Sequence, residues 1–353
     1  MDTVARRLLT RGARFIGNCL SKTNGWEDFV LLAGTHAAID VRRIERLCDL
    51  SDAGFRVFSQ WDDDGIIEWL VTRLPGIPKS FVEFGVEDYL ESNTRFLLRH
   101  RNWRGLVMDG STDNIKKVSG HRMYYQHDLH AVAAFIDRDN INSLLQQHGF
   151  AGEIGILSID IDGNDYWIWQ AIDEVSPWIL IVEYNAVFGN TLPISIPYDA
   201  SFDRRRAHSS MLYYGASVKA LEYLGSNRGY ALIGSNHAGN NAFFIRDDLL
   251  PRFEGAIADR RPRPSLVREA RGPNGARALV SGTSRLQLVA EMAVTDVESG
   301  KSLRLGEAGE LYSGEWLAAM GEPRGVLRIN RTRGEERAAR GPQRMNAQTG
   351  DAG

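Results

Sequence analysis

The segment Lys79–Ser111 determines the predicted fold, and its sequence is KSFVEFGVEDYLESNTRFLLRHRNWRGLVMDGS. The apolar run Ser80–Val86 is too short for a globular helix and predicts a buried strand. Gly85 interrupts this run, as expected where the backbone has to approach another group closely. Helical spacing follows over Thr94–Arg101, and Gly105–Met108 predicts a second short buried strand. The segment therefore predicts one β-α-β unit.

Acidic residues surround the turn of this unit. Asp109 comes about 24 residues after the turn glycine, the spacing at which an acid reaches a ribose hydroxyl in nucleotide-binding folds. The turn has one glycine and carries Glu83 and Asp88, whose carboxylates would repel a pyrophosphate. They suit a cationic, phosphate-free ligand such as S-adenosylmethionine, whose ribose offers two hydroxyl donors. An ordinary α/β turn without a ligand is the alternative interpretation.

The stretches FVEFGVEDYLESNTRFLL and NWRGLVMDGS resemble the first two motifs of FkbM-type, class I S-adenosylmethionine-dependent methyltransferases. The resemblance covers roughly Phe58 to Arg246. It implies an α/β fold with a Rossmann-like methyltransferase sheet, mostly parallel with its last strand antiparallel. The matching features are Glu83, Gly85, Ser92-Asn93-Thr94, Trp103, Gly105 and Asp109.

The resemblance also implies which residues bind the cofactor. Gln60 is expected beside it, together with Asp64-Gly65. Asp128, after a third predicted strand at Met123–Gln126, is expected to accept a hydrogen bond from the adenine amine, unless it is a solvated loop acid. The full expected set is Gln60, Glu83, Gly85, Asn93, Thr94, Asp109, Gly110, Ser111 and Asp128.

Composition limits the other possibilities. The 353 residues suffice for one large or two modest domains, and the net charge of −3 gives no general attraction to nucleic acid, so we expect no such partner. Cys19 and Cys48 lack a metal-type spacing, which excludes a disulfide scaffold and favours the cytoplasm. No apolar run approaches the roughly 20 residues of a membrane span.

Four segments are predicted along the chain. They are a helical N-terminal cap (1–75), a methyltransferase domain (76–255), a C-terminal extension with a basic linker and a hairpin (256–330), and a disordered tail (331–353). The N-terminal arginines Arg6, Arg7, Arg11 and Arg14 fit a transit peptide, a membrane-surface helix or a plain terminal helix. Homo-oligomerisation is left open by the sequence.

Polar residues follow two predicted strands in succession. Ile154–Ile161 is apolar on both faces, as a central parallel strand should be, and Trp178–Val182 predicts the next strand. Active sites of open parallel sheets lie beyond the carboxyl ends of the strands, where both polar clusters fall. The clusters comprise Asp160, Asp162 and Asp165 after the first strand, and Glu183 and Asn185 after the second.

These residues predict either of two chemistries. Hard oxygen ligands from two strand ends suit a divalent cation such as Mg²⁺, which would lower the pKa of a substrate hydroxyl. The predicted metal ligands are Asp160, Asp162, Glu183 and Asn185. In a metal-free alternative, Asp160, Asp162 or Glu183 takes the proton, or His208 does so from the irregular insert that follows. A plain turn and helix cap is the non-functional interpretation.

Together these features favour O-methylation of a hydroxyl on a sugar or glycan precursor, or on a secondary metabolite. The run Arg204–Arg206 suits an anionic substrate such as a uronate or phosphorylated sugar, although a solvated charge run has the same pattern. Asn236, Asn240 and Asn241 suit sugar hydroxyls or shape a hairpin. One rival is a nicotinamide-dependent oxidoreductase, disfavoured by the missing second and third glycines. The other is a non-catalytic scaffold with a methyltransferase-like fold.

Overall fold

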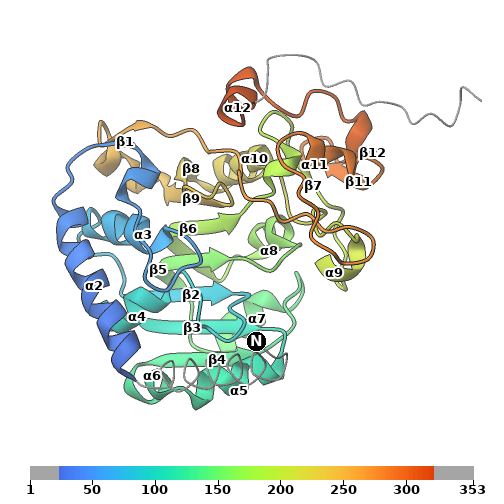
Figure 1. Cartoon of the computed structure of the whole chain (residues 1–353). Helices are drawn as coiled ribbons and strands as arrows, with labels where there is room; N and C mark the ends of the chain where they lie inside the picture. The colour runs from blue at the N-terminus through green and yellow to red at the C-terminus, as the bar shows by residue number, and fades with distance from the viewer. Residues whose placement is uncertain (1–23, 322–353) are drawn as a thin grey trace, which may run out of the picture.

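The computed structural model describes residues 24–321, so the predicted N-terminal arginine segment and the predicted tail at 331–353 lie outside the described residues. A seven-stranded sheet forms the centre of the molecule (Figure 1). Its strands are β2 (Ser80–Phe84), β3 (Arg104–Asp109), β4 (Leu129–Ala133), β5 (Gly152–Ile159), β6 (Val175–Glu183), β8 (Tyr230–Ser235) and β9 (Asn241–Arg246).

The strand order is β4-β3-β2-β5-β6-β9-β8. Strands β4 to β6 pair in parallel, whereas β9 runs antiparallel to both β6 and β8. The predicted Rossmann-like sheet is thus confirmed, including its antiparallel last strand. Because β2 and β5 are neighbours although the chain visits β3 and β4 between them, the sheet reverses its direction of growth there. Such a reversal is where open α/β sheets bind ligands.

Side chains of the central strands alternate between two hydrophobic cores, one on each face of the sheet. In β6, Leu180 and Val182 join one core while Ile179 and Ile181 join the other, and all four are buried. This two-sided burial explains why these strands are continuously apolar. At roughly 1.5–3 kcal/mol for each fully buried aliphatic side chain, the two cores supply most of the stabilising free energy of the sheet.

Helices cover both faces of the sheet. Helices α3, α4, α5 and α6 contribute buried side chains to one core. Helices α7, α8 and α10 contribute buried side chains to the other. The long helix α2 packs against the outside of α3 and α4 (Figure 1). The bounds are α2 (Asn24–Arg42), α3 (Asp63–Thr72), α4 (Arg95–Arg101), α5 (Thr112–Gly120), α6 (Arg122–Gln126), α7 (Ile141–Gln147), α8 (Asp165–Ala171) and α10 (Val218–Arg228).

The C-terminal part of the described chain pairs with earlier segments. Strand β1 (Leu47–Asp49) lies parallel to β10 (Ile257–Asp259), and β7 (Ile194–Ser195) lies antiparallel to β11 (Ala293–Asp296). The predicted hairpin is confirmed, since β11 pairs with β12 (Ser302–Arg304). The domain boundaries stay predictions. The remaining elements are η1 (Leu50–Ala53), η2 (Ala186–Phe188), α9 (Arg204–Ala207), η3 (Asp247–Phe253), α11 (Ser284–Gln287), η4 (Leu305–Glu307) and α12 (Gly314–Ala319).

One strand prediction is wrong. The segment Met123–Gln126 is not a strand but the end of helix α6, and the third parallel strand is β4, three residues further on. Its aromatic residues favour a strand by propensity. The imidazole Nδ1 of His121 nevertheless accepts a hydrogen bond from the backbone N–H of Met123 and caps a helical turn, in which Tyr125 is almost fully exposed. Local capping here overrides propensity.

Within residues 24–321, no helix is both long enough and apolar enough to cross a membrane. The cytoplasmic location and the oligomeric state stay predictions.

Gly85 makes a close backbone contact at the carboxyl edge of the sheet. Its φ is +72°, and a Cβ atom added to it would lie 1.5 Å from the backbone oxygen of Asp160. The turn after β2 therefore passes directly against the end of β5, which only a glycine allows.

We predict that Gly85→Ala lowers the free energy of unfolding by at least about 2 kcal/mol, because the added methyl group must push the two strand ends apart. Urea denaturation measures the effect. Gly120→Ala is the matched control: a Cβ there meets nothing within 4 Å, so it should leave stability equal or higher. Equal stability of Gly85→Ala and wild type would contradict the close approach.

Candidate functional site

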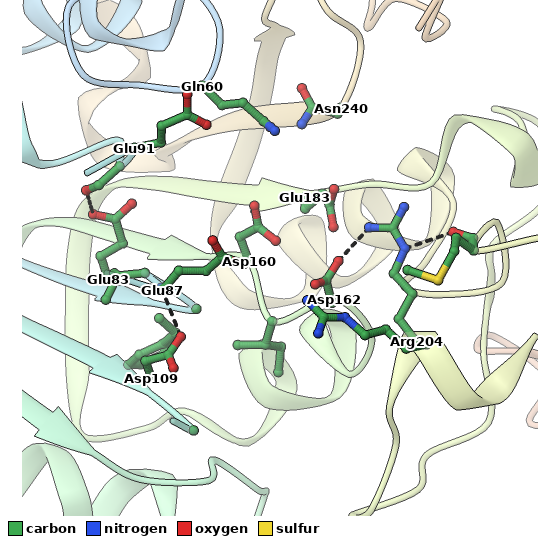
Figure 2. Close-up of a pocket in the computed structure, with 18 of the residues that line it drawn as sticks. Gln60, Glu83, Glu87, Glu91, Asp109, Asp160, Asp162, Glu183, Arg204 and Asn240 are labelled. Carbon is green, nitrogen blue, oxygen red and sulfur yellow. Dashed lines mark hydrogen bonds and ion pairs between the residues drawn. The ribbon is translucent and has the colours of Figure 1, made fainter. Parts of the chain in front are cut away.

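A cavity of about 880 Å³ opens at the carboxyl edge of the parallel strands. The ends of β2, β3, β5 and β6 supply its floor, and the loop before α3 supplies Gln60 and Trp61. The other walls are Ala134–Ile136 after β4, residues of the segment 202–211, and residues of the C-terminal segment 267–277. Figure 2 shows the acidic side chains of the floor converging on the cavity from several strands.

Glu83, at the end of β2, holds the turn that follows. Its Oε1 accepts a hydrogen bond from the N–H of Asn93, and its Oε2 accepts hydrogen bonds from the hydroxyls of Ser92 and Thr94. Burial raises the pKa of this carboxyl, although these hydrogen bonds oppose the shift. Glu83 lines the cavity together with Gly85 and Asn93, but its oxygens are already engaged, and Thr94 lies outside the lining. Glu83 therefore acts by shaping the pocket.

Asp109, at the end of β3, is held in one orientation. Its Oδ2 accepts a hydrogen bond from the N–H of Glu87 at 2.9 Å. Its Oδ1 accepts from the N–H of Ser111 at 2.8 Å and from the amide of Asn114 at 3.1 Å. Asp109, Gly110 and Ser111 all line the cavity. Both lone pairs of Oδ1 are thus engaged, and Oδ2 keeps one with which it can accept a hydroxyl donor.

An apolar wall stands beside Asp109, and the sequence analysis missed it. Ala134, Phe135 and Ile136 follow β4 and line the cavity, and the ring of Phe135 is 58% exposed. A Cβ added to Gly110 would meet that ring at 3.4 Å. The wall suits one face of a flat heterocycle. Its sequence signal was the apolar run LHAVAAFI, which the misplaced strand obscured.

Asp128 does not lie at this edge of the sheet. Its backbone carbonyl accepts a hydrogen bond from the N–H of Gly105, near the start of β3, so Asp128 precedes β4 at the opposite edge. Its exposed carboxylate faces Arg104 at 3.7 Å and His130 at 3.4 Å. The expected adenine contact is therefore wrong. The error follows from placing the strand ahead of Asp128 instead of after it.

Three carboxylates gather at the ends of β5 and β6. One oxygen each of Asp160, Asp162 and Glu183 lie within 4.8 Å of one another. Burial raises the pKa of Asp160 and of Glu183 well above the usual range, and the negative charges of the neighbouring carboxylates add to the shift. Glu183 Oε2 is buried without any hydrogen-bond partner.

The donor set at this cluster fits a divalent cation. All three side chains offer hard oxygen atoms, which Mg²⁺ and similar ions prefer. An unpartnered buried carboxylate oxygen, as in Glu183, is costly unless a cation or a proton satisfies it. The same features also fit a general base, because a carboxyl with a raised pKa accepts a proton near neutral pH.

Arg204 closes one side of the cluster. Its guanidinium pairs with Asp162 at 2.5 Å and with Glu269 at 3.0 Å, and it donates to the carbonyl of Met211. It also stacks over the ring of Tyr214 at 3.6 Å. Figure 2 shows Arg204 reaching Asp162 from the side opposite Asp109. Among these three carboxylates Arg204 makes an ion pair with Asp162 only, and its charge opposes the rise in the pKa of Asp160 and of Glu183 without cancelling it.

Two predicted site residues are not brought to the cluster. Asn185 donates its amide hydrogens to the carbonyls of Leu212 and Tyr214, and its Oδ1 accepts from the N–H of Val187. Asn185 does not line the cavity, and its buried Oδ1 is bonded to the N–H of Val187, so this ligand prediction is corrected. His208 does not line the cavity, and its Nδ1 lies 2.8 Å from the hydroxyl of Ser210. We therefore drop His208 as a base.

Asn240 presents a donor to the cavity. Its Oδ1 accepts a hydrogen bond from the amide of Asn236 at 2.8 Å, which leaves its NH₂ group for a ligand. Asn236 in turn donates to Asp63, and Asn241 donates to the same carboxylate at 3.0 Å. Figure 2 places Asn240 near Gln60, across the cavity from Asp109. The fully buried Asp63 thus orients a polar group that faces the cavity.

The remaining predicted cofactor residue, Gln60, lines the cavity, whereas Asp64 is outside the cavity lining. The carboxylate of Asp64 accepts hydrogen bonds from the N–H groups of Val57, Phe58 and Ser59. Asp64 therefore shapes the loop that presents Gln60.

Comparisons with known proteins found no matching family model and no matching curated protein. Solved structures do match. An O-methyltransferase from Bacillus cereus in complex with SAH is 12% identical with a TM-score of 0.38, covering 66% of this chain and 94% of that one. A methyltransferase from Geobacter sulfurreducens is 14% identical with a TM-score of 0.34, covering 67% and 96%. The N-terminal domain of EvdMO1 with SAH bound is 10% identical with a TM-score of 0.35, covering 60% and 94%. These values assign no activity to this chain, whose chemistry has to come from its own side chains.

We predict that millimolar Mn²⁺ or Mg²⁺ raises the melting temperature of the wild type by a few degrees, because a cation relieves the repulsion among the three carboxylates. Glu183→Gln should remove the response, since it deletes one ligand oxygen and one charge. Asp128→Asn, which alters an acid at the opposite edge, should keep it. Differential scanning calorimetry measures all three, and no response in the wild type would favour the metal-free base.

We predict that Asp63 gives the stability of the protein a pH dependence. Burial raises its pKa to about 7, so the folded chain holds a proton there that the unfolded chain releases near pH 4. The stability it contributes is therefore present at low pH and lost as the pH rises through 7. Asp63→Asn should remove a fall of about 2–3 kcal/mol in the free energy of unfolding between pH 5 and pH 8. Exposed Asp113→Asn is the control, and an unchanged slope in Asp63→Asn would contradict the raised pKa.

Proposed function

We propose that this chain is an S-adenosylmethionine-dependent O-methyltransferase of the FkbM-like type, acting on a hydroxyl of a sugar or glycan precursor or of a secondary metabolite. The observation that carries the proposal is the cluster of Asp160, Asp162 and Glu183 at two neighbouring strand ends. It lies in one cavity with an acid-lined, partly apolar cleft suited to a cationic nucleoside.

The sheet side of the cavity fits this cofactor. Asp109 Oδ2 can accept one ribose hydroxyl, and Phe135 and Ile136 provide an apolar face for the adenine. The lining acids there are Glu83, Glu87, Glu91, Asp109, Asp160, Asp162 and Glu183. Their negative potential favours the ammonium and the sulfonium. When bound, the cofactor supplies an electrophilic methyl group on its sulfonium.

Transfer to a hydroxyl needs an acceptor for its proton. The methyl carbon–sulfur bond breaks as the carbon–oxygen bond forms, and the hydroxyl proton leaves, so the products are a methyl ether, S-adenosylhomocysteine and one proton. Asp160 is the group we assign to take that proton, because it lines the cavity and no ion pair or hydrogen bond within residues 24–321 engages its side chain. Asn240 can donate a hydrogen bond to a neighbouring substrate oxygen and orient the acceptor.

A metal-assisted version uses the same residues. Asp160, Asp162 and Glu183 would hold the ion, with Arg204 keeping Asp162 in place. A divalent cation bound there would supply Lewis acidity toward the acceptor hydroxyl. Asn185 takes no part in either version, since it lies outside the cavity lining and its amide bonds the carbonyls of Leu212 and Tyr214.

The two rivals fit the site less well. A nicotinamide dinucleotide needs donors for a pyrophosphate near the first turn, whereas the cavity lining around Asp109 contains Glu83, Glu87 and Glu91 and no lysine or arginine. A non-catalytic scaffold gives no reason to bury Glu183 Oε2 without a partner inside a cavity.

We predict that S-adenosylhomocysteine binds the full chain in calorimetric titration and that NAD does not. Asp109→Asn should weaken this binding roughly 10- to 100-fold, because hydrogen bonds to a charged acceptor are worth about 1.5–3 kcal/mol. Asp113→Asn, an exposed acid of the same segment, should change affinity less than about twofold. Binding of NAD instead, or of neither ligand, would overturn the proposal.

A further inference from the structure

Acidic and basic side chains line different parts of the cavity. All of its lining carboxylates except Glu269 come from the sheet ends, the turns after them and the loop before α4. All of its lining basic side chains are arginines from two late segments, Arg204 and Arg205 of α9 and Arg268, Arg271 and Arg277 of the segment 267–277. The cavity therefore has an acidic floor and a basic mouth.

Four of the mouth arginines carry uncompensated charge. Arg204 is neutralised by Asp162 and Glu269. By contrast, none of the other four has a carboxylate partner among residues 24–321, and all four are exposed. Some arginines elsewhere, such as Arg246 and Arg261, pair with carboxylates, and others, such as Arg252, are unpaired within the described chain but lie outside the cavity lining. Guanidinium groups of like charge around one opening repel one another unless an anion lies between them.

The segment that carries three of these arginines is held in place. The buried guanidinium of Arg285 donates hydrogen bonds to the carbonyls of Ser265 and Val267. The N–H of Arg271 donates to the carbonyl of Ser210, which ties this segment to the one that follows α9. A backbone bridge between Arg271 and Arg277 closes a narrow loop. The backbone that carries these arginines is therefore anchored by hydrogen bonds to the rest of the protein.

We propose that the methyl acceptor carries a phosphate or diphosphate group, which Arg205, Arg268, Arg271 and Arg277 bind at the mouth of the cavity while the hydroxyl to be methylated points to the floor. This inference rests on the proposed function for the role of the floor. A sugar phosphate or a nucleotide-linked sugar has this chemistry. Guanidinium groups are well suited to phosphate because their planar forks donate two parallel hydrogen bonds.

The number of arginines favours phosphate over carboxylate. A single carboxylate is satisfied by one bidentate guanidinium, whereas a diphosphate offers several oxygens and more than one negative charge. The floor would repel the same group, so an acceptor with one anionic end and one neutral, hydroxyl-bearing end can enter in a single direction. The two halves of the cavity would therefore select both the acceptor and its orientation.

The test is calorimetric titration of the full chain, saturated with S-adenosylhomocysteine, with inorganic pyrophosphate in metal-free buffer. We expect saturable binding that weakens as NaCl is added. The variant Arg268→Gln/Arg271→Gln/Arg277→Gln should bind pyrophosphate at least about tenfold more weakly, since it removes three charge-assisted contacts. Arg252→Gln, an exposed arginine outside the cavity, should change affinity less than about twofold.

Separate readouts distinguish the two proposals. S-adenosylhomocysteine is titrated first, and it should bind the triple variant as tightly as the wild type, which also shows that the variant is folded. Failure of that titration in the wild type would overturn the proposed function and leave the arginine site to its own measurement. No pyrophosphate binding, equal binding by the triple variant, tighter binding of glucuronate, or much tighter binding of a single-stranded oligonucleotide would each overturn the phosphate-bearing acceptor.

Discussion

Mutual repulsion among the clustered carboxylates of Asp160, Asp162 and Glu183 is the constraint on which the carboxyl edge of the sheet depends. Two unit negative charges about 5 Å apart repel by on the order of 3 kcal/mol at a protein-like dielectric, and burial of Asp160 and Glu183 adds to that cost. Only a rigid frame can hold such groups together. The parallel strands β5 and β6 do so because each is buried on both faces and cannot move away from its neighbour without opening a core.

Other residues compensate part of this negative charge. Glu83 is engaged by the turn that follows it, and Asp162 is engaged by Arg204. Among the described residues, Asp160 and Glu183 make no ion pair, although the charge of Arg204 acts on both. The exposed arginines of the mouth have no carboxylate partner there. A ligand that is cationic near Asp109 and anionic near the late arginines would compensate both. Function and stability are thus opposed at this edge of the sheet, which is common at active sites.

Local patterns predicted the elements that depend on neighbours in sequence. The unit from β2 to β3 and the acids after β5 and β6 were predicted because a strand period, a glycine and a terminal acid lie within a few residues of one another. Asp128 and Met123–Gln126 were misplaced because the helical cap from His121 outweighs the aromatic propensity of that segment. Asn185 was a reasonable ligand by position, but its partners Leu212 and Tyr214 are distant in sequence. The arginines of 267–277 gave no local signal, because only the tertiary fold brings them to the cavity.

The same electrostatics favour a hydroxyl over an amine as the methyl acceptor. A neutral amine is already nucleophilic and needs no partner with a raised pKa, whereas an alcohol must lose its proton as the new bond forms. The raised pKa values of Asp160 and Glu183 suit them to receive that proton, and a divalent cation held by the same oxygens would suit the same purpose. An ammonium acceptor would also need a base, so the base alone does not separate the two acceptors, whereas a hard divalent cation would favour an oxygen. The cluster of hard oxygen donors at the strand ends is therefore the structural argument for oxygen as the proposed acceptor atom.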